Sequence, residues 1–292
     1  MLGLIGLGLV GSALVERFHA AGFELFGYDI DTGKMNALQE KGLNTCASPR
    51  EVAERARRIV LSLPNSDIVN TVVEGPGGIL EGAQPEAIIV DTTTADPGMS
   101  AALAQRVREK NIHFLDATIL ASSEQVRQRD ALVLVGGQVE NFNTCEDIFT
   151  AFSQKTVHMG PNGKGAEAKL IYNLVLGLHR LVLAEGLVLG IKSGFDPNRL
   201  LAIFREGSTY SRVMDIKGDK MIAGDFTPQA KLEQHLKDVG LILDLGARTD
   251  TPLPLSALHA QLLRSGVAQG FGDEDNSAIV KVLQKMAGII DE

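Results

Sequence analysis

The chain has 292 residues, 45% of them hydrophobic, which is enough for a sizeable core in one large domain or two smaller ones. Its 28 Lys and Arg residues against 36 Asp and Glu residues give a net charge of −8, and it contains no basic tract of the kind that binds nucleic acid or an anionic membrane. Cys46 and Cys145 provide neither a disulfide framework nor metal-ligand spacing, so we expect no metal and a protein of the reducing cytoplasm.

The first thirty residues have the pattern of a dinucleotide-binding fold. An apolar strand over residues 2–5 is followed by a turn with Gly6, Gly8 and Gly11 and by a helix that ends at Gly22. A second strand over residues 24–28 then leads to Asp29. This order and spacing are those of the Rossmann fingerprint. The apolar start lacks the basic leading region of a signal peptide and is needed for this fold instead.

Each part of the fingerprint has a physical task at a bound cofactor. The first glycine makes the tight turn, the second lets the backbone approach a pyrophosphate, and the third lets helix and strand pack closely. The helix start offers free N–H groups to phosphate, and we expect the loop residues Leu7, Leu9 and Val10 to bind there. Asp29 can accept hydrogen bonds from the adenosine ribose and would repel a 2′-phosphate, so NAD is favoured over NADP.

Short apolar runs alternate with helical stretches up to about residue 160. The strand candidates are residues 58–62, 87–90, 112–115 and 131–135, and the helix candidates include residues 97–110 and 139–153. This alternation predicts a mostly parallel, doubly wound α/β sheet with helices on both faces. From Gly163 onward apolar residues recur at helical spacing, in residues 164–192, 197–206, 228–247, 254–266 and 275–289. We therefore predict a Rossmann domain over residues 1–163 and an all-helical substrate and oligomerisation domain over residues 164–292.

The first helix after this boundary is long and apolar. At about 1.5 Å per residue it would span roughly 40 Å and join both domains as a spine. Its apolar run, residues 170–190, is interrupted by Asn173, His179, Arg180 and Glu185, which favours a helix buried in protein over a membrane span. So much apolar helix suggests a subunit interface, and we expect a homodimer or homotetramer.

Lys169 and Asn173 are candidates for chemistry near the start of this helix. They stand four residues apart and therefore on one face, among small or apolar neighbours. A nicotinamide cofactor carries the hydride, so the protein has to position the substrate and supply a proton donor or acceptor. Partial burial can bring a lysine pKa toward the working range. Asn173 could hold the substrate oxygen or fix the lysine side chain.

Further motifs follow the glycine fingerprint in order along the chain. They are Leu63-Pro64-Asn65, Gly77-Gly78-Ile79-Leu80, Asp91-Thr92-Thr93-Thr94 before Pro97, Phe114-Leu115-Asp116-Ala117, Gly136-Gly137, Gly163-x-Gly165, Lys169-Leu170-Ile171-Tyr172-Asn173, Lys237-Asp238 and Asp275-x-Ser277-Ala278. With these motifs the chain resembles, nearly from end to end, the β-hydroxyacid dehydrogenase family, of which 3-hydroxyisobutyrate dehydrogenase is the familiar member.

The resemblance implies roles for several residues. Lys169 would be the general acid/base, and Asn173 would position it and the substrate. Imine-reducing relatives usually lack the lysine, so Lys169 indicates alcohol and carbonyl chemistry. Asp29 stands where NADP-preferring members often carry Asn-Arg, and the following Ile30 offers no charge for a phosphate. The cofactor would also be contacted by Leu63, Pro64 and Asn65, which line its cleft, by Thr94 near the nicotinamide, and by Lys237 from the helical domain.

The chain departs from the family at the substrate loop. The family's Asp-Ala-Pro-Val-Ser-Gly-Gly becomes Asp-Ala-Thr-Ile-Leu-Ala-Ser-Ser over residues 116–123, so that Leu120 removes a hydroxyl donor and narrows the pocket. A replacement donor would have to come from Ser122, Ser123, Thr118 or an arginine such as Arg127 or Arg129. Ser122 is the best single choice.

A second departure lies just before Lys237. The family is apolar there, whereas this chain reads Ala-Lys-Leu-Glu-Gln-His-Leu over residues 230–236. Gln234 shares the face of Lys237, three residues away, and His235 is either a substrate contact or a polar rim residue. Ala230 in place of a bulky aromatic residue would enlarge the pocket near it. Both departures argue against 3-hydroxyisobutyrate itself as the substrate.

Together these features predict an NAD-dependent oxidoreductase that interconverts a β-hydroxy acid with its semialdehyde or ketone and takes a small carboxylated substrate. The altered loop leaves open a reductase of a larger or differently charged sugar acid or semialdehyde. An NAD(H)-binding sensor or scaffold without turnover is a third possibility. The pair of Lys169 and Asn173 counts against it, because binding alone needs neither residue.

Overall fold

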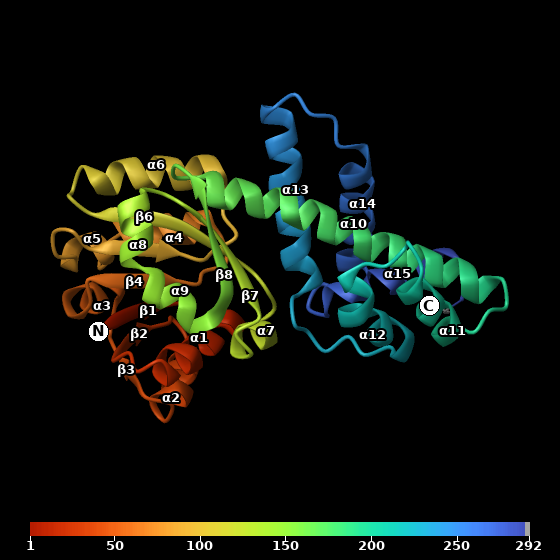
Figure 1. Cartoon of the computed structure of the whole chain (residues 1–292), viewed down its shortest axis with the longest axis horizontal. Coiled ribbons are helices and arrows are strands. Elements are labelled where there is room, and N and C mark those ends of the chain that lie inside the picture. The colour runs from red at the N-terminus through yellow and green to blue at the C-terminus, as the bar shows by residue number, and fades with distance from the viewer. Residues whose placement is uncertain (290–292) are drawn as a thin grey trace. The chain divides into compact units, whose positions relative to one another are not determined.

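The computed structural model describes residues 1–289, and the chain divides into two compact units, Met1–Lys169 and a second that begins at Leu170 (Figure 1). The first unit is an α/β fold and the second is helical. The predicted fold class is therefore confirmed.

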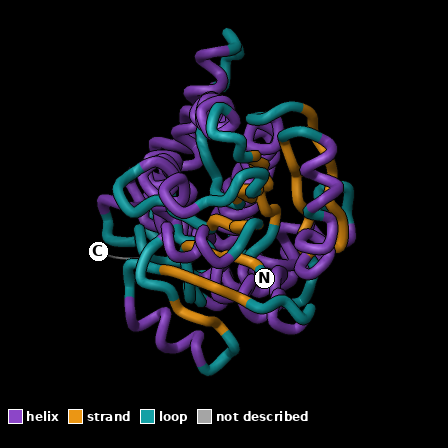
Figure 2. The backbone as a smooth tube through the Cα atoms, turned by 90° about the vertical axis from the view of Figure 1, so that its left-hand side faces the viewer, coloured by secondary structure: helices purple, strands orange, loops and turns teal. Residues whose placement is uncertain are grey.

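The first unit is built on one sheet of eight strands in the order β3-β2-β1-β4-β5-β6-β7-β8 (Figures 1 and 2). All neighbouring strands are parallel except β6 and β7, which are antiparallel. The strands are β1 (Leu2–Ile5), β2 (Leu25–Tyr28), β3 (Leu43–Thr45), β4 (Arg58–Leu61), β5 (Ile88–Asp91), β6 (His113–Leu120), β7 (Ala131–Gly136) and β8 (Ser153–Gly160). The strand order reverses between β1 and β4, which is where open α/β sheets bind their ligands.

Alternate side chains of the central strands enter two separate cores. Val60 and Val90 belong to one hydrophobic cluster, with Phe18 and Phe149 of covering helices, whereas Ile59 and Ile89 belong to the other. This period of two is what a sheet covered on both faces requires. The helices of this unit are α1 (Leu9–Ala20), α2 (Thr32–Gln39), α3 (Pro49–Arg55), α4 (Ser66–Glu74), α5 (Ile79–Gly82), α6 (Pro97–Arg108), α7 (Ser123–Arg127), α8 (Val139–Thr144) and α9 (Glu146–Phe152).

The first unit differs from the expected elements in four places. Strands β3 and β8 had no counterpart, because β3 has three residues and β8 is an edge strand with exposed polar positions. The strand expected at residues 112–115 continues to Leu120 by pairing with β7. The helix expected at residues 139–153 is broken at Cys145 into α8 and α9.

The second unit packs helices around one hydrophobic cluster that includes Leu187, Leu263 and Ile279. Its elements are α10 (Lys164–Lys192, which begins in the first unit), α11 (Pro197–Glu206), a π-helix η1 (Met214–Gly218), α12 (Asp219–Ala223), α13 (Leu232–Arg248), α14 (Pro254–Ala268), a 3-10 turn η2 (Asn276–Ala278) and α15 (Ile279–Met286). The segment η1 and α12 was not predicted, because it contains Gly218 and alternates charged with apolar residues.

The helix α10 has the length and composition to cross a membrane, and within residues 1–289 no other helix does. The same test is met by the core helix of a globular protein. Lys169 and Arg180 of this helix are 8% and 4% exposed, so these two cations lie against protein.

The start of α10 is fixed to the sheet by a buried carboxylate. Asp116, in β6, is 1% exposed and accepts hydrogen bonds from the backbone N–H groups of Gly163 at 2.8 Å and Ala166 at 2.9 Å. Burial raises the pKa of Asp116, and the backbone donors oppose that rise. Only glycine fits at position 165, because a Cβ there would lie 2.4 Å from the carbonyl oxygen of Asp116. The carboxylate thus caps a helix whose N–H groups have no other acceptor within the helix.

We predict that Asp116→Ala lowers the free energy of unfolding by about 2–4 kcal/mol, because two buried N–H groups lose their acceptor. Asp116→Asn should cost less, since its amide oxygen can still accept one bond. Urea unfolding of both variants measures the effect. The exposed acid Glu24 supplies the control variant Glu24→Ala, which should unfold like the wild type. Equal stability of Asp116→Ala and the wild type would contradict the anchoring role.

Candidate active site

The three glycines of the fingerprint occupy different surroundings. Gly6 has a φ of +92°, and a Cβ on it would lie 2.2 Å from the carbonyl oxygen of Ser62. A Cβ on Gly11 would lie 2.0 Å from the carbonyl oxygen of Gly6. Gly8 differs, because a Cβ there would meet no protein atom within 4 Å. The first and third glycines are therefore required by the protein's own packing, and the second faces open space into which a pyrophosphate fits.

The start of α1 is suited to bind an anion. Gly8 occupies the N-cap position, no side chain caps the helix, and no acidic residue lies in its first turn. Its N–H groups and the positive end of the helix dipole are thus available to a phosphate. The residues present fit the dinucleotide that the fingerprint implies.

Asp29 is held rigidly at the end of β2. Its Oδ2 accepts from the N–H of Leu7 at 2.7 Å, and its Oδ1 accepts from the N–H of Asp31 at 2.9 Å. These bonds join the acid to the glycine loop. The ammonium of Lys34 lies 3.8 Å from Oδ1 and is 46% exposed. Sequence reasoning missed Lys34, which places a cation beside the predicted ribose-binding acid.

The segments after β4 and β5 end at the same edge of the sheet as the glycine loop. In the sheet register Ile5 lies beside Leu61, and Leu61 lies beside Asp91. The next residues along these strands are the predicted cofactor contacts. The N–H of Leu63 donates to Thr93 Oγ1 at 3.2 Å, Pro64 is exposed, Asn65 caps α4 by accepting from the N–H of Ile68 at 3.0 Å, and Thr94 is half-buried.

Lys169 reaches the far end of β6. Its ammonium donates to the carbonyl oxygen of Ile119 at 2.7 Å, in a buried contact. Because Asp91 lies beside Asp116 in the register, Ile119 and Leu120 extend beyond the edge at which β5 ends. The lysine head is therefore next to the residues in which this chain departs from its family.

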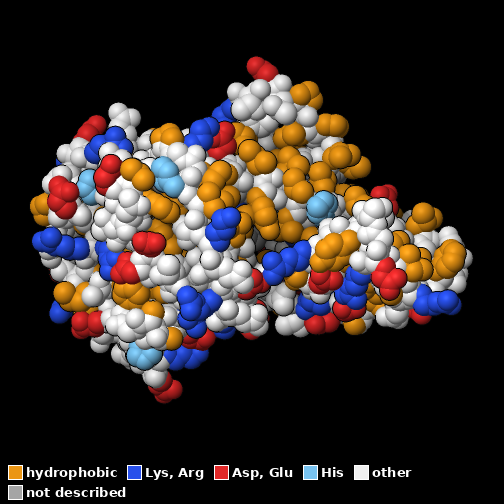
Figure 3. All heavy atoms as spheres, viewed as in Figure 1, with side chains coloured by type: hydrophobic (Ala, Val, Ile, Leu, Met, Phe, Trp, Pro, Cys, Tyr) orange, Lys and Arg blue, Asp and Glu red, His pale blue; other side chains and the backbone are white. Residues whose placement is uncertain are grey.

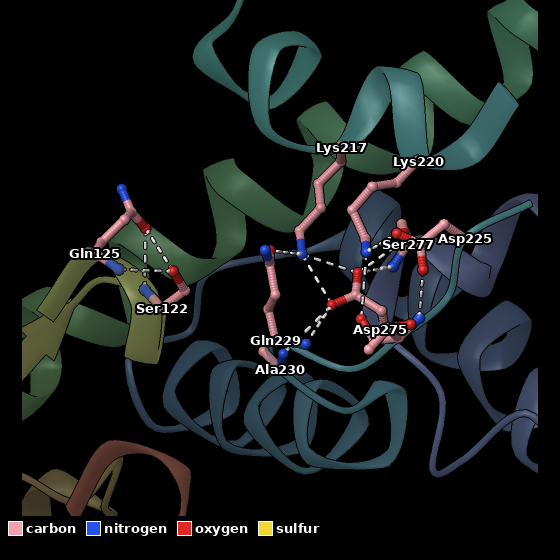
Figure 4. Close-up of polar contacts among 10 residues, drawn as sticks. Ser122, Gln125, Lys217, Lys220, Asp225, Gln229, Ala230, Asp275 and Ser277 are labelled. Carbon is pink, nitrogen blue, oxygen red and sulfur yellow. Dashed lines mark hydrogen bonds and ion pairs between the residues drawn. The ribbon is translucent and has the colours of Figure 1, made fainter. Parts of the chain in front are cut away.

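Two of the predicted substrate donors, Thr118 and Ser122, already have hydrogen-bond partners in the first unit. Thr118 is buried and its hydroxyl donates to the carbonyl oxygen of Gly165 at 3.1 Å. Ser122 forms a capping box with Gln125, in which its Oγ accepts from the Gln125 N–H at 3.3 Å (Figure 4). Ser123 and Leu120 are each 7% exposed. The segment expected as a loop is strand up to Leu120, which leaves Ala121 and Ser122 between β6 and α7.

In the second unit one carboxylate joins two predicted residues. Asp238 Oδ2 accepts from Asn173 Nδ2 at 2.9 Å, and Asp238 Oδ1 lies 3.2 Å from the ammonium of Lys237. Because a carboxylate only accepts, the amide nitrogen of Asn173 faces Asp238 and its Oδ1 faces the other way, as an acceptor. The sequence motif Lys237-Asp238 included this acid, but its hydrogen bond to Asn173 could be seen only in the folded structure.

The neighbouring residues Gln234 and His235 differ in their exposure to solvent. Gln234 is exposed, whereas His235 is 6% exposed and packs against α10. A Cβ on Gly177 would lie 2.6 Å from His235 Nε2, so glycine at this position admits the imidazole. The ring of His259, on α14, lies 5.2 Å from that of His235. His259 was not among the predicted residues, since α14 shows no motif around it.

Comparisons with known proteins identify the family of the chain. Residues 1–160 match the family described as the NAD binding domain of 6-phosphogluconate dehydrogenase, and residues 163–283 match one described as NAD-binding of NADP-dependent 3-hydroxyisobutyrate dehydrogenase. The 2-(hydroxymethyl)glutarate dehydrogenase of Eubacterium barkeri is 32% identical over 289 residues, which are 99% of this chain and 96% of that protein. The chain belongs to the β-hydroxyacid dehydrogenase family related to 3-hydroxyisobutyrate dehydrogenase.

Other β-hydroxyacid dehydrogenases are similar over nearly the whole chain. The L-threonate dehydrogenase of Cupriavidus necator is 28% identical and covers 96% of this chain and 95% of its own length. The mouse mitochondrial 3-hydroxyisobutyrate dehydrogenase is 29% identical and covers 97% and 87%. A Salmonella typhimurium 3-hydroxyisobutyrate dehydrogenase structure, 23% identical, has the same fold, with a TM-score of 0.88 over 96% of this chain and 99% of that chain. The chain is accordingly an NAD(P)-dependent oxidoreductase that acts on CH–OH groups.

Proposed function

We propose that this dehydrogenase interconverts a β-hydroxy acid with its semialdehyde or ketone, with Lys169 as the general acid/base. A bound nicotinamide supplies or accepts the hydride. The observation that carries the proposal is the buried ammonium of Lys169 at the Ile119 carbonyl, one helical turn before Asn173. In the oxidative direction the neutral amine takes the hydroxyl proton, and in the reductive direction the ammonium returns it. In this proposal Asn173 Oδ1, which faces away from Asp238, accepts from the substrate hydroxyl or from the lysine.

The altered segment supports a substrate other than a simple 3-hydroxy acid. The hydroxyls of Thr118 and Ser122 already have partners, and Leu120 offers none. We therefore propose a larger or differently charged hydroxy acid as the second candidate. The panel to test contains 3-hydroxyisobutyrate, L-threonate and 2-(hydroxymethyl)glutarate, the compounds for which the similar dehydrogenases are named.

We predict that Lys169→Ala lowers turnover of any accepted substrate by at least about 10²-fold, the usual worth of a positioned acid or base, and leaves NADH binding intact. Steady-state rates and NADH fluorescence titration measure the two effects. Lys164→Ala is the matched control, because Lys164 lies on the same helix, is exposed and pairs with Glu167. Turnover within tenfold of the wild type would contradict the role of Lys169. Bound NADH without turnover on any compound in the wild type would favour the sensor.

We propose NAD rather than NADP as the preferred cofactor, because Asp29 follows the second strand of the fold, where a carboxylate accepts from the ribose hydroxyls and would repel a 2′-phosphate. Asp29→Ala should raise the ratio of kcat/KM with NADPH to that with NADH by at least about tenfold, by removing a like charge. Lys34 then loses one of its two carboxylate partners, keeping Asp31, and can face the phosphate. The double variant Asp29→Ala, Lys34→Ala should lose most of the gain. An unchanged ratio in the single variant would show that Asp29 does not select the cofactor.

We propose a homo-oligomer that covers one face of α10. Ile171, Val175, Val182 and Leu189 are 46–67% exposed and fall within about 40° of one another around the helix. On the α14 surface Leu255 and Leu258 are 63% and 57% exposed, and Figure 3 shows hydrophobic side chains gathered over the helical unit. Exposed apolar surface of this kind commonly marks an interface.

Val182→Asp combined with Leu189→Asp should convert the oligomer to a monomer, because each introduced carboxylate would have to be buried without a partner. Light scattering coupled to gel filtration measures the mass. Ser193→Asp, exposed just beyond the same helix, is the control and should keep the wild-type mass. A monomeric wild type at micromolar concentration would contradict the proposal.

A further inference from the structure

Arg180 lies on the same face of α10 as Lys169 and Asn173, the two residues proposed to act on the substrate. At about 100° per residue Lys169, Asn173 and Arg180 fall within about 40° of one another around the helix. All three are at most 8% exposed, and Arg180 is 4% exposed. A buried guanidinium therefore lies in line with the two residues proposed to handle the carbinol.

Arg180 has no hydrogen-bond partner for two of its nitrogens. Within the described residues, Nε and Nη1 are buried and meet no acceptor. Burial lowers the pKa of Arg180 to about 10, so the side chain remains a cation at neutral pH. An isolated buried charge is costly, and proteins usually compensate it with an anion. Within residues 1–289 no side chain or carbonyl accepts from these two nitrogens of Arg180, so an acceptor is missing at this position.

The carboxylate of Asp275 interacts electrostatically with Arg180, but its oxygens accept hydrogen bonds from other groups. Asp275 accepts from the ammonium of Lys217 with both oxygens, at 2.8 and 2.9 Å (Figure 4). It also accepts from the N–H and Oγ of Ser277 and from the N–H of Gln229. Two buried cations share one carboxylate that is already fully hydrogen-bonded. Asp238, the other buried carboxylate among residues 170–289, accepts from Asn173, so both buried carboxylates are engaged with groups other than Arg180.

His259 is a second hydrogen-bond donor near Arg180. His259 is 2% exposed, and its Nε2 has no partner within residues 1–289. Burial, and then the charge of Arg180, lower the pKa of His259 to about 4, so its ring is neutral and can donate one hydrogen bond. Its Cε1 would lie 2.9 Å from a Cβ on Gly177, which is the residue between Asn173 and Arg180 on this side of α10.

We infer that Arg180 and His259 form a subsite for a second anionic group, a carboxylate at the far end of the hydroxy acid. The inference rests on the proposed function, because the substrate's near end is set by Lys169 and Asn173. Seven residues separate Asn173 from Arg180, a rise of about 10 Å, and helical side chains lean toward the N-terminus, which brings the guanidinium closer to Asn173. A guanidinium matches a carboxylate with two parallel hydrogen bonds. The substrate class is a hydroxy dicarboxylate.

A matched pair of 2-(hydroxymethyl) acids tests the subsite, one ending in a carboxylate and the other in a methyl group at the same chain length. The wild type should prefer the diacid in kcat/KM, and Arg180→Met should reduce the ratio of diacid to monoacid by about 10- to 100-fold, the worth of charged hydrogen bonds. Arg180→Lys should restore part of the ratio. Arg199→Met, an exposed arginine of α11, is the control and should keep the wild-type ratio. An unchanged ratio in Arg180→Met would overturn the subsite and leave the proposed function standing.

A binding measurement separates the subsite from turnover. Glutarate should raise the thermal midpoint of the wild-type chain, whereas pentanoate should not, and Arg180→Met should abolish the glutarate shift. This readout holds even if no hydroxy acid is turned over, and it also shows whether each variant is folded. Equal shifts with the two acids, equal shifts in wild type and Arg180→Met, or no glutarate shift at all would each overturn the subsite.

Discussion

The capping of α10 by Asp116 is the interaction on which the proposed chemistry depends. A carboxylate buried in β6 accepts from the N–H groups of Gly163 and Ala166, and one turn later Lys169 returns to the same strand at the Ile119 carbonyl. Helix and strand are thus joined at two points, at the N–H groups of Gly163 and Ala166 and at the side chain of Lys169. A side chain held between two such points loses little freedom when substrate binds, which is how a proton donor is preorganised.

The helix α10 reverses the usual distribution of polarity. Lys169, Asn173 and Arg180 are buried on one side, whereas Ile171 and Val182 are among the exposed apolar residues on the other. Burying the polar stripe costs free energy unless each group finds a partner. For Asn173 the partner is Asp238, and for Arg180 we assign it to the substrate. The apolar stripe is the part of the helix that we assign to a second copy of the chain.

Two regions of the chain bear on how the substrate's charge is held, the altered segment around β6 and the interior of the helical unit. Around β6 the hydroxyls of Thr118 and Ser122 serve the protein's own backbone and Gln125. In the helical unit a cation and a neutral imidazole are buried without enough acceptors. Moving a charged contact from a strand end to a guanidinium changes which acids bind, since a site built for a charge rejects a ligand that leaves it unpaired.

Local patterns in the sequence determined the fold class, the glycine loop, Asp29 and the shared face of Lys169 and Asn173, because each depends on residues close in sequence and on the period of one element. The edge strands β3 and β8 escaped prediction because pairing with a neighbouring strand, not an apolar period, holds them, and the π-helix η1 did so because it contains Gly218 and alternates charged with apolar residues. Only the tertiary structure decided which hydroxyls are engaged, that Lys34 meets Asp29, that Asp238 orients Asn173, and that Arg180 is left without a carboxylate. Hydrogen bonds and charge pairs join residues far apart in sequence, and their partners exist only once the chain has folded.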